Sequence, residues 1–131
     1  MTACALIHVA AIAYGVSLLP KLVDKLNPER TTRKIAIVLS FGLLVIVAAH
    51  TIQIWSWAAC LSILNAFEDF STSFYFATVT YTTLGYGDLI LGERLRIFAT
   101  FASITGLLTF GISTAFLIAL ITRMFPSIAT R

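Results

Sequence analysis

The stretch Thr82-Thr83-Leu84-Gly85-Tyr86-Gly87-Asp88 is a short, polar, glycine-rich segment between two long apolar parts of the chain. Lipid cannot hydrogen-bond an irregular backbone, so non-helical chain at membrane depth persists only where protein buries it or where it lines a water-filled path. The two glycines that flank Tyr86 can adopt backbone angles that residues with a Cβ avoid. A run of carbonyl oxygens can then turn toward one axis. Copies of the loop around that axis would give rings of oxygen that replace a cation's water shell.

The composition places the whole chain in a membrane. It has 131 residues, of which 59% are hydrophobic and only 11% are charged. A soluble domain of this size is less apolar and more charged. The sequence therefore predicts one all-α integral membrane domain. It contains no nucleophile triad, metal-ligand spacing or phosphate loop, so we expect no enzyme, and its basic residues form no separate face for nucleic acid.

Three apolar runs, residues 3–19, 35–55 and 94–124, are long enough to cross a bilayer. Pro20 is expected to end the first helix, and Asn27-Pro28-Glu29 to begin the second. The competing interpretation of the first run is a secretory signal. Such signals open with basic residues, and none precedes Lys21.

The segment between the second and third runs is too short to cross. Trp55 and Trp57 fit an aromatic belt at the outer interface. Asp69 or Ser71 can cap a short helix that runs to Thr82, and an acid at that end suits the helix dipole. We expect this helix to enter from outside and to point its negative end at an ion path.

The charges give the topology. The linker and the C-terminal end hold seven of the nine basic residues: Lys21, Lys25, Arg30, Arg33, Lys34, Arg123 and Arg131. Four of the six acids lie near the glycine-rich loop: Glu68, Asp69, Asp88 and Glu93. The positive-inside rule then predicts a cytoplasmic linker and C-terminus, with the N-terminus and the loop outside.

The segment Thr83-Leu84-Gly85-Tyr86-Gly87-Asp88 resembles the selectivity filter of potassium channels. From about residue 35 to residue 121 the order is apolar helix, aromatic-rich short helix, filter and apolar helix, as in that family's two-helix pore module. The stretch Gly106-Leu107-Leu108-Thr109-Phe110-Gly111 lies where the inner helix of the family carries a hinge glycine and a Phe-Gly pair. A lone glycine pair would usually be a turn, but the full motif with both helices favours the family.

The resemblance implies a potassium-channel pore module of outer helix, pore helix, filter loop and inner helix, preceded here by one additional transmembrane helix. The domains expected are an N-terminal helix over 1–20, a cytoplasmic basic linker over 21–34, the pore domain over 35–125 and a short cytoplasmic tail over 126–131. One chain supplies one filter segment, so the resemblance also implies a homotetramer with closed fourfold symmetry.

The resemblance implies roles for the loop residues. K⁺ would bind the backbone carbonyls of Thr83, Leu84, Gly85 and Tyr86, together with the Thr83 hydroxyl. Gly85 and Gly87 would supply the unusual backbone angles, and Tyr86 would point away from the axis against neighbouring aromatics. Leu84 replaces the commoner valine, which should leave ion choice unchanged because its carbonyl does the binding.

Asp88 would lie at the outer mouth and tie the filter to the pore helix. Some bacterial relatives place a glutamate behind the filter, at a position that is Val79 here. Asp88 then needs another partner, and Tyr75, at the site of the family's aromatic cuff, is the candidate. Phe74 and Phe76 are interpreted as packing residues.

The inner helix has a four-residue repeat. Phe110, Thr114, Ile118 and Thr122 map onto the pore-facing stripe of the family, and an apolar ring such as Ile118 can close a pore by dewetting. The alternative is a packed helix seam. Gly106 is the better hinge candidate, whereas Gly111 suits close helix packing.

Other polar residues in the apolar runs have two interpretations each. For His50 and Gln53 an interhelical hydrogen bond is favoured over pH sensing, and His8 is placed near the outer interface. Cys4 and Cys60 are interpreted as small buried side chains rather than a disulfide. No run carries arginine at every third position, so a voltage sensor is not expected.

The sequence therefore predicts a potassium-selective channel in the plasma or inner membrane, with lipid and three identical subunits as partners. Two alternatives remain open. A potassium uptake transporter subunit usually carries four related loops in one chain, most without a full Gly-Tyr-Gly-Asp. A non-conducting structural or regulatory subunit could keep the pore fold.

Overall fold

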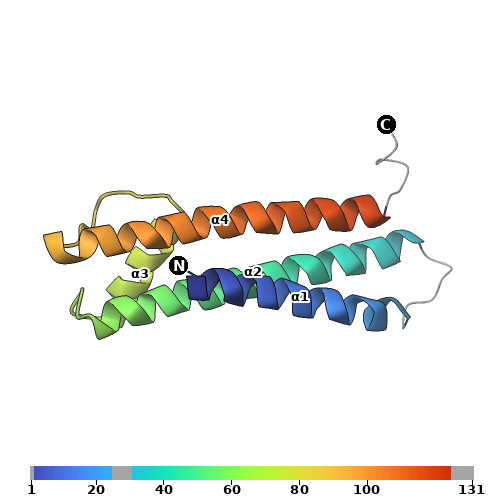
Figure 1. Ribbon diagram of the computed structural model, residues 1–131, viewed down its shortest axis with the longest axis horizontal. Coiled ribbons are helices and arrows are strands. Elements are labelled where there is room, and N and C mark those ends of the chain that lie inside the picture. Colours follow the sequence, from blue (N-terminus) through green and yellow to red (C-terminus); the bar gives the residue numbers. More distant parts are fainter. Residues whose placement is uncertain (1, 25–30, 125–131) are drawn as a thin grey trace.

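The computed structural model describes residues 2–24 and 31–124, and these residues form four helices and no strand. The helices are α1 (Thr2–Asp24), α2 (Thr31–Ile63), α3 (Phe70–Tyr81) and α4 (Glu93–Met124). Figure 1 shows the long helices α1, α2 and α4 running side by side, with the short α3 crossing between α2 and α4 near one end. This arrangement confirms the predicted all-α pore module with an additional N-terminal helix.

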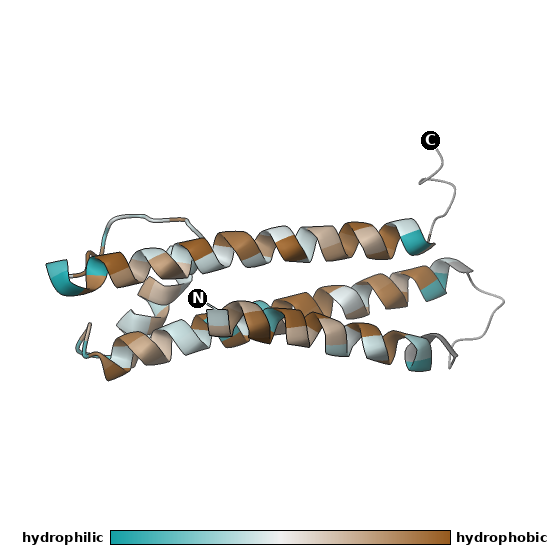
Figure 2. Cartoon of the chain, in the orientation of Figure 1, coloured by the Kyte–Doolittle hydropathy of each residue, from teal (hydrophilic) through white to brown (hydrophobic). Residues whose placement is uncertain are grey.

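The three long helices each contain a stretch whose length and composition suit a membrane span. These stretches are Thr2–Lys21, Thr32–Ile63 and Glu93–Met124. Apolar residues cover much of the helices, and hydrophilic residues gather toward the helix ends (Figure 2). A window this apolar and almost free of charge is stable in hydrocarbon, so the chain is a multi-pass membrane protein.

The path of the chain separates most of the basic residues from the glycine-rich loop, with Arg94 and Arg96 at the start of α4 as the exceptions. The ends of α1 and α4 and the start of α2 lie at one end of the molecule, whereas α3 and the loop that follows it lie at the other (Figure 1). Lys21 and Arg123 stand in the last turns of α1 and α4. The basic end and the loop are thus opposite, as the charge pattern requires.

Helix α1 does not end at Pro20, as the sequence analysis expected, but continues to Asp24. Proline removes one backbone hydrogen bond and crowds the preceding turn, which bends a helix without always ending it. Near the end of a helix only the last turn is affected. The expected start of the second helix at Asn27-Pro28-Glu29 lies outside the described residues.

Helix α2 extends beyond Trp55 to Ile63, so the two tryptophans lie within the helix and on different faces. Trp55 is exposed and packs beside Phe74, with ring centroids 5.2 Å apart. Trp57 is buried and packs edge-on against Phe98 of α4, also at 5.2 Å. The prediction of an interfacial belt was therefore wrong for Trp57, which belongs to the core between α2 and α4.

The short helix α3 begins as predicted at an aspartate cap. The Asp69 carboxylate accepts hydrogen bonds from the Thr72 N–H at 2.8 Å and from the Thr72 hydroxyl at 2.6 Å. These bonds hold the pKa of Asp69 below its usual value, because they favour the charged form. The other end of α3 is buried at Tyr81, directly before the glycine-rich loop.

Glycines bring the long helices close together. A Cβ at Gly15 would lie 2.8 Å from a Val45 side-chain carbon, so α1 and α2 approach closely there. A Cβ at Gly42 would lie 2.7 Å from Leu120 of α4. Without a hydrophobic effect between helices in lipid, such close packing is a main source of association. These contacts fix α1 and α4 on α2.

Candidate functional site

The loop after α3 alternates in backbone hand. Positive φ angles occur at Thr83 (58°), Gly85 (56°) and Gly87 (77°), but not at Leu84 or Tyr86. When every second residue is left-handed, successive peptide groups turn to the same side, whereas in a strand they point to opposite sides. The two glycines therefore have the expected unusual angles. Thr83 is the unexpected member, because a β-branched residue rarely adopts positive φ.

The N–H groups at the start of the loop point back at the pore helix. Thr83 N–H donates to Thr80 O at 3.0 Å, and the N–H groups of Leu84 and Gly85 both donate to Val79 O, at 3.0 and 3.3 Å. Within the described residues, none of the carbonyl oxygens from 83 to 87 accepts a hydrogen bond. The loop thus satisfies the N–H groups of Thr83, Leu84 and Gly85 and leaves a row of acceptors free.

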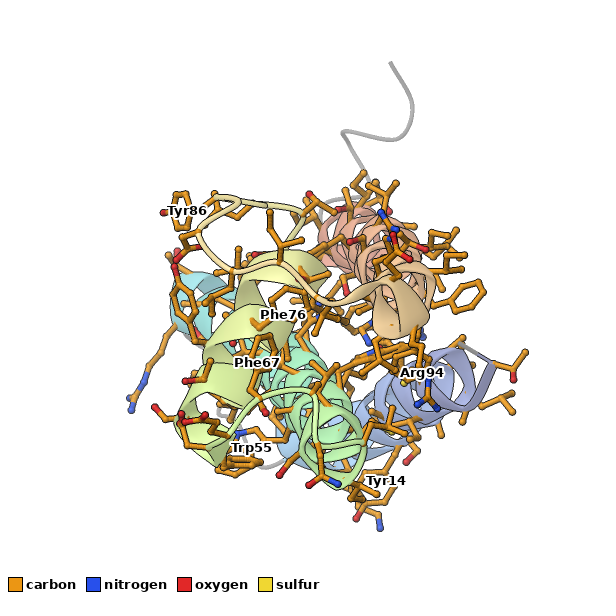
Figure 3. All side chains as sticks on the ribbon, turned by 90° about the vertical axis from the view of Figure 1, so that its left-hand side faces the viewer. Tyr14, Trp55, Phe67, Phe76, Tyr86 and Arg94 are labelled. Carbon is orange, nitrogen blue, oxygen red and sulfur yellow. The ribbon has the colours of Figure 1, made fainter. Side chains whose placement is uncertain are left out.

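The loop is open to its surroundings. Residues 82–88 are all exposed, and the Tyr86 side chain is 68% exposed. In the view from the loop end, Tyr86 lies at the outer edge of the molecule, whereas Phe67 and Phe76 lie between the helices (Figure 3). Irregular backbone with free carbonyls is not stable against lipid, so this loop requires protein or water around it.

The loop is tied to the pore helix at its far end by the pair that the sequence analysis expected. The Tyr75 hydroxyl donates a hydrogen bond of 2.7 Å to the Asp88 carboxylate. This bond raises the pKa of Tyr75, because it stabilises the protonated phenol beside a negative group. Tyr75 therefore remains a donor at neutral pH. That the pair supports the filter remains a prediction.

The buried end of α3 is fastened to α4. The Ser103 hydroxyl donates to Thr80 O at 2.9 Å. One turn further, a Cβ on Gly106 would collide with the carbonyl oxygen of Tyr81, which only a glycine avoids. By contrast, a Cβ on Gly111 would meet nothing within 4 Å. Close packing within this chain thus occurs at Gly106 and not at Gly111, and the hinge role of Gly106 stays a prediction.

The predicted pore-facing stripe of α4 lies mostly away from the other helices. Thr114 and Ile118 are exposed, and the hydroxyls of Thr114 and Thr122 bond to carbonyls of their own helix, at 2.9 Å and 3.0 Å. Phe110 differs, because its ring packs against His50 with centroids 4.5 Å apart. The stripe below Phe110 is therefore available to line a pore. Its pore-lining role stays a prediction.

A buried polar cluster lies behind the loop, and the sequence analysis predicted the hydrogen bonding of His50 in it but not the burial of His8. His50 bonds to Tyr81 of α3 at 2.8 Å and to Ser113 of α4 at 3.0 Å, which agrees with the expected interhelical hydrogen bond. His8 was placed near the outer interface, but it is fully buried and bonds to Ser113 and Gln53. A histidine on an otherwise apolar helix was the signal for this site.

The two cysteines are free thiols: Cys4 is partly buried against the core and Cys60 is exposed. Cys60 is thus not the buried side chain that the sequence analysis expected.

The chain was compared with protein families, curated proteins and solved structures. The model of a family described as "Ion channel" matches residues 34–123, which is more than half of the chain and includes α3, the loop and nearly all of α2 and α4. No curated protein and no solved structure matches.

Proposed function

The chain belongs to this ion channel family, that of the two-helix potassium channels, and from this membership we propose that it is a potassium-selective channel. In this proposal K⁺ moves passively down its electrochemical gradient. The ion loses its water shell and is held by backbone carbonyl oxygens of Thr83, Leu84, Gly85 and Tyr86, with the Thr83 hydroxyl at the inner end.

One observation carries the proposal. The backbone alternates in hand from Thr83 to Gly87 while the first N–H groups of the loop bond back to α3, which leaves successive carbonyls unpaired. Free, closely spaced carbonyl oxygens are ligands suited to an alkali cation and poor ligands for an anion. An ordinary turn would instead use these carbonyls within the chain.

A single loop cannot surround an ion, so the channel is proposed to be a homotetramer with fourfold symmetry. The exposure of the loop and of Tyr86 supports this, because neighbouring subunits would cover both. The gathering of Lys21 and Arg123 at the end opposite the loop supports a cytoplasmic location for that end, with the loop and the N-terminus outside.

Two other functions, a potassium uptake transporter subunit and a non-conducting subunit, would require different features of the chain. A potassium uptake transporter subunit would need further filter loops, and this chain has one. A non-conducting subunit would need no selective filter, so it gives no reason for φ to alternate from Thr83 to Gly87. Family membership favours ion transport over catalysis.

Rubidium flux into liposomes that contain the purified protein tests the proposal. We expect barium-sensitive uptake that sodium does not replace. Gly85→Ala should abolish selective flux, because its φ of 56° strains any residue with a Cβ. Gly92→Ala is the matched control, since Gly92 has no such angle and open space around it. Absent flux from correctly assembled protein would contradict the proposal and favour the non-conducting subunit.

A further inference from the structure

Six buried polar side chains from all four helices form one continuous chain of hydrogen bonds. They are His8 of α1, His50 and Gln53 of α2, Tyr81 of α3, and Thr109 and Ser113 of α4. Buried polar groups in lipid are costly unless they are paired, so such a chain is held as a unit. The two ends of this chain of bonds fix the donor at each bond.

The first end is Gln53, whose Nε2 lies 2.8 Å from His8 Nδ1 and 3.3 Å from the carbonyl oxygen of Ala49. A backbone carbonyl only accepts, so the atom facing it is the amide nitrogen. The same nitrogen donates its other hydrogen to His8. His8 Nδ1 is therefore an unprotonated acceptor, and the ring proton of His8 lies on Nε2.

The other end is Thr109, whose hydroxyl donates to the carbonyls of Thr105 and Gly106, at 2.8 and 3.1 Å. Its oxygen must then accept from the Tyr81 hydroxyl at 2.8 Å. Tyr81 has no second hydrogen, so its oxygen accepts from His50 Nδ1, also at 2.8 Å. The ring proton of His50 consequently lies on Nδ1, and its Nε2 is an acceptor.

The two ends meet at the Ser113 hydroxyl. Its oxygen lies 2.9 Å from His8 Nε2 and 3.0 Å from His50 Nε2. Because the ring proton of His8 lies on Nε2, His8 donates to the Ser113 oxygen. Because His50 Nε2 is an acceptor, it takes the hydroxyl hydrogen of Ser113. One hydroxyl does both, so all the bonds run in one direction with opposite tautomers on the two histidines.

A second proton on either ring has no acceptor in this chain of bonds. On His8 it would face the Gln53 amide hydrogen, and on His50 it would face the hydroxyl hydrogen of Ser113. The two rings are also only 4.8 Å apart between centroids, so two charges would repel. The bonds keep this direction only while both imidazoles are neutral, because a second proton would require the Gln53 amide or the Ser113 hydroxyl to turn.

The other titratable groups facing the histidines are few. Tyr81 faces them from α3, and Cys4 of α1 packs against the same core. From α4 only the hydroxyls of Thr109 and Ser113 reach the chain of bonds. Neither a phenol nor a thiol normally takes up a proton as the pH falls from neutral, so the histidines are the groups that respond to acid.

We propose that His8 and His50 are positioning residues: through Ser113 and Tyr81 they hold the pore helix against the inner helix, and they do so only while both rings are neutral. Tyr81 is the point of action, because its hydroxyl bonds to Thr109 of α4, its carbonyl packs against Gly106, and it lies two residues before Thr83. This gives α1 a role in the alignment of the filter. The proposal rests on the proposed channel function.

The first test reads the tautomers directly and does not depend on conduction. The chain contains two histidines, so ¹⁵N spectra of the full protein in lipid bilayers at about pH 7.5 give two ring systems. We expect a protonated Nε2 for His8 and a protonated Nδ1 for His50. The same tautomer on both rings, or the reverse assignment, would overturn the proposed chain of bonds.

The second test compares rubidium flux at about pH 3.5 with flux at about pH 7.5, a range that extends well below the ordinary histidine pKa. Wild-type flux should fall about fivefold at the lower pH, the ratio that corresponds to one lost hydrogen bond of ordinary net strength. In the double variant His8→Gln, His50→Asn the fall should disappear. Glutamine keeps an N–H near the Nε2 position and asparagine keeps one near Nδ1, while neither titrates.

The controls separate the two proposals. The double variant retains all carboxylates, so an equal fall in wild type and variant would assign the pH effect elsewhere and overturn the positioning role. Ser113→Ala, a smaller change, should also reduce the pH dependence because it removes the shared hydroxyl. If no protein conducts at about pH 7.5, the channel function fails, while the spectra still decide the tautomers.

Discussion

Thr83 has a φ of 58°, a strained angle for a β-branched residue, and it occupies the first position of the proposed ion-binding loop. The strain is held by its own N–H bond to Thr80 and by the next two N–H groups, which bond to Val79. Hydrogen bonds to Thr80 and Val79 thus hold the inner end of the loop. At the outer end, the bond between Tyr75 and Asp88 holds it.

Tyr75→Phe removes one hydroxyl and leaves the Asp88 carboxylate without its hydrogen bond. We expect the conducting state to be shorter-lived, and single-channel recording of inactivation measures this. Tyr14→Phe is the control, because Tyr14 is 68% exposed and its hydroxyl has no partner among the described residues. Equal inactivation in both variants would mean that the Tyr75–Asp88 pair does not stabilise the filter.

Gly106→Ala puts a Cβ against the Tyr81 carbonyl, where the backbone cannot easily move aside. Overpacking of this kind costs about 1–3 kcal/mol of folding free energy. Thermal unfolding in detergent should show the loss for Gly106→Ala and little change for Gly111→Ala, which enters open space. A changed open probability with wild-type stability would instead support a hinge.

The sequence could predict the backbone angles and contacts of some residues but not of others. The angles of Gly85 and Gly87 follow from glycine chemistry, and the Tyr75–Asp88 contact follows from the absence of an acid at Val79. The angle of Thr83 could not be predicted, because the end of α3 imposes it. The burial of His8 could not be predicted either, since it depends on how α1 packs on α2.

At the scale of elements, the pore helix α3 is short and is therefore fixed at its ends rather than by its own length. Asp69 caps its first turn, and Ser103 and Gly106 of α4 hold its last turn. The direction of its carbonyls toward the loop follows from these two attachments. The alignment of the filter thus depends on both.

Asp69→Ala removes the cap and should loosen the outer end of α3, which hydrogen exchange of the Thr72 amide measures as faster exchange. Asp69→Asn should retain most of the protection, because the amide oxygen still accepts. The folded-state pKa of Asp69 is lowered, so the stabilisation is present above its ordinary pKa and is lost only as the pH falls through the lowered value. Protection that is unchanged in Asp69→Ala would show that the cap is dispensable.

The elements themselves were largely predictable from apolar length. Residues 94–124 were expected as a helix, and α4 covers Glu93–Met124. The errors concern ends: α1 passes Pro20, and α2 continues beyond Trp55. The extension of α2 goes with the burial of Trp57, Ala58 and Leu61 in the core, which a single sequence does not display. Pro20 lies so near the end of α1 that it affects only the last turn.

At the scale of the whole molecule, one chain buries its histidines and its core but leaves its loop uncovered. An exposed loop at membrane depth is unstable alone, so we expect further copies of the chain around it. Fourfold closure would cover Tyr86 and bring four sets of carbonyls to one axis. The family match does not include α1, whose proposed role is to support this arrangement from behind.

An electron-microscopy map of the protein in lipid and K⁺ tests the central claim most directly. We predict a fourfold particle with density for ions on the axis, between rings formed by the carbonyls of Thr83, Leu84, Gly85 and Tyr86. Replacing K⁺ by Na⁺ should weaken that axial density. A particle without fourfold symmetry, or one whose loops lie far from any common axis, would contradict the account.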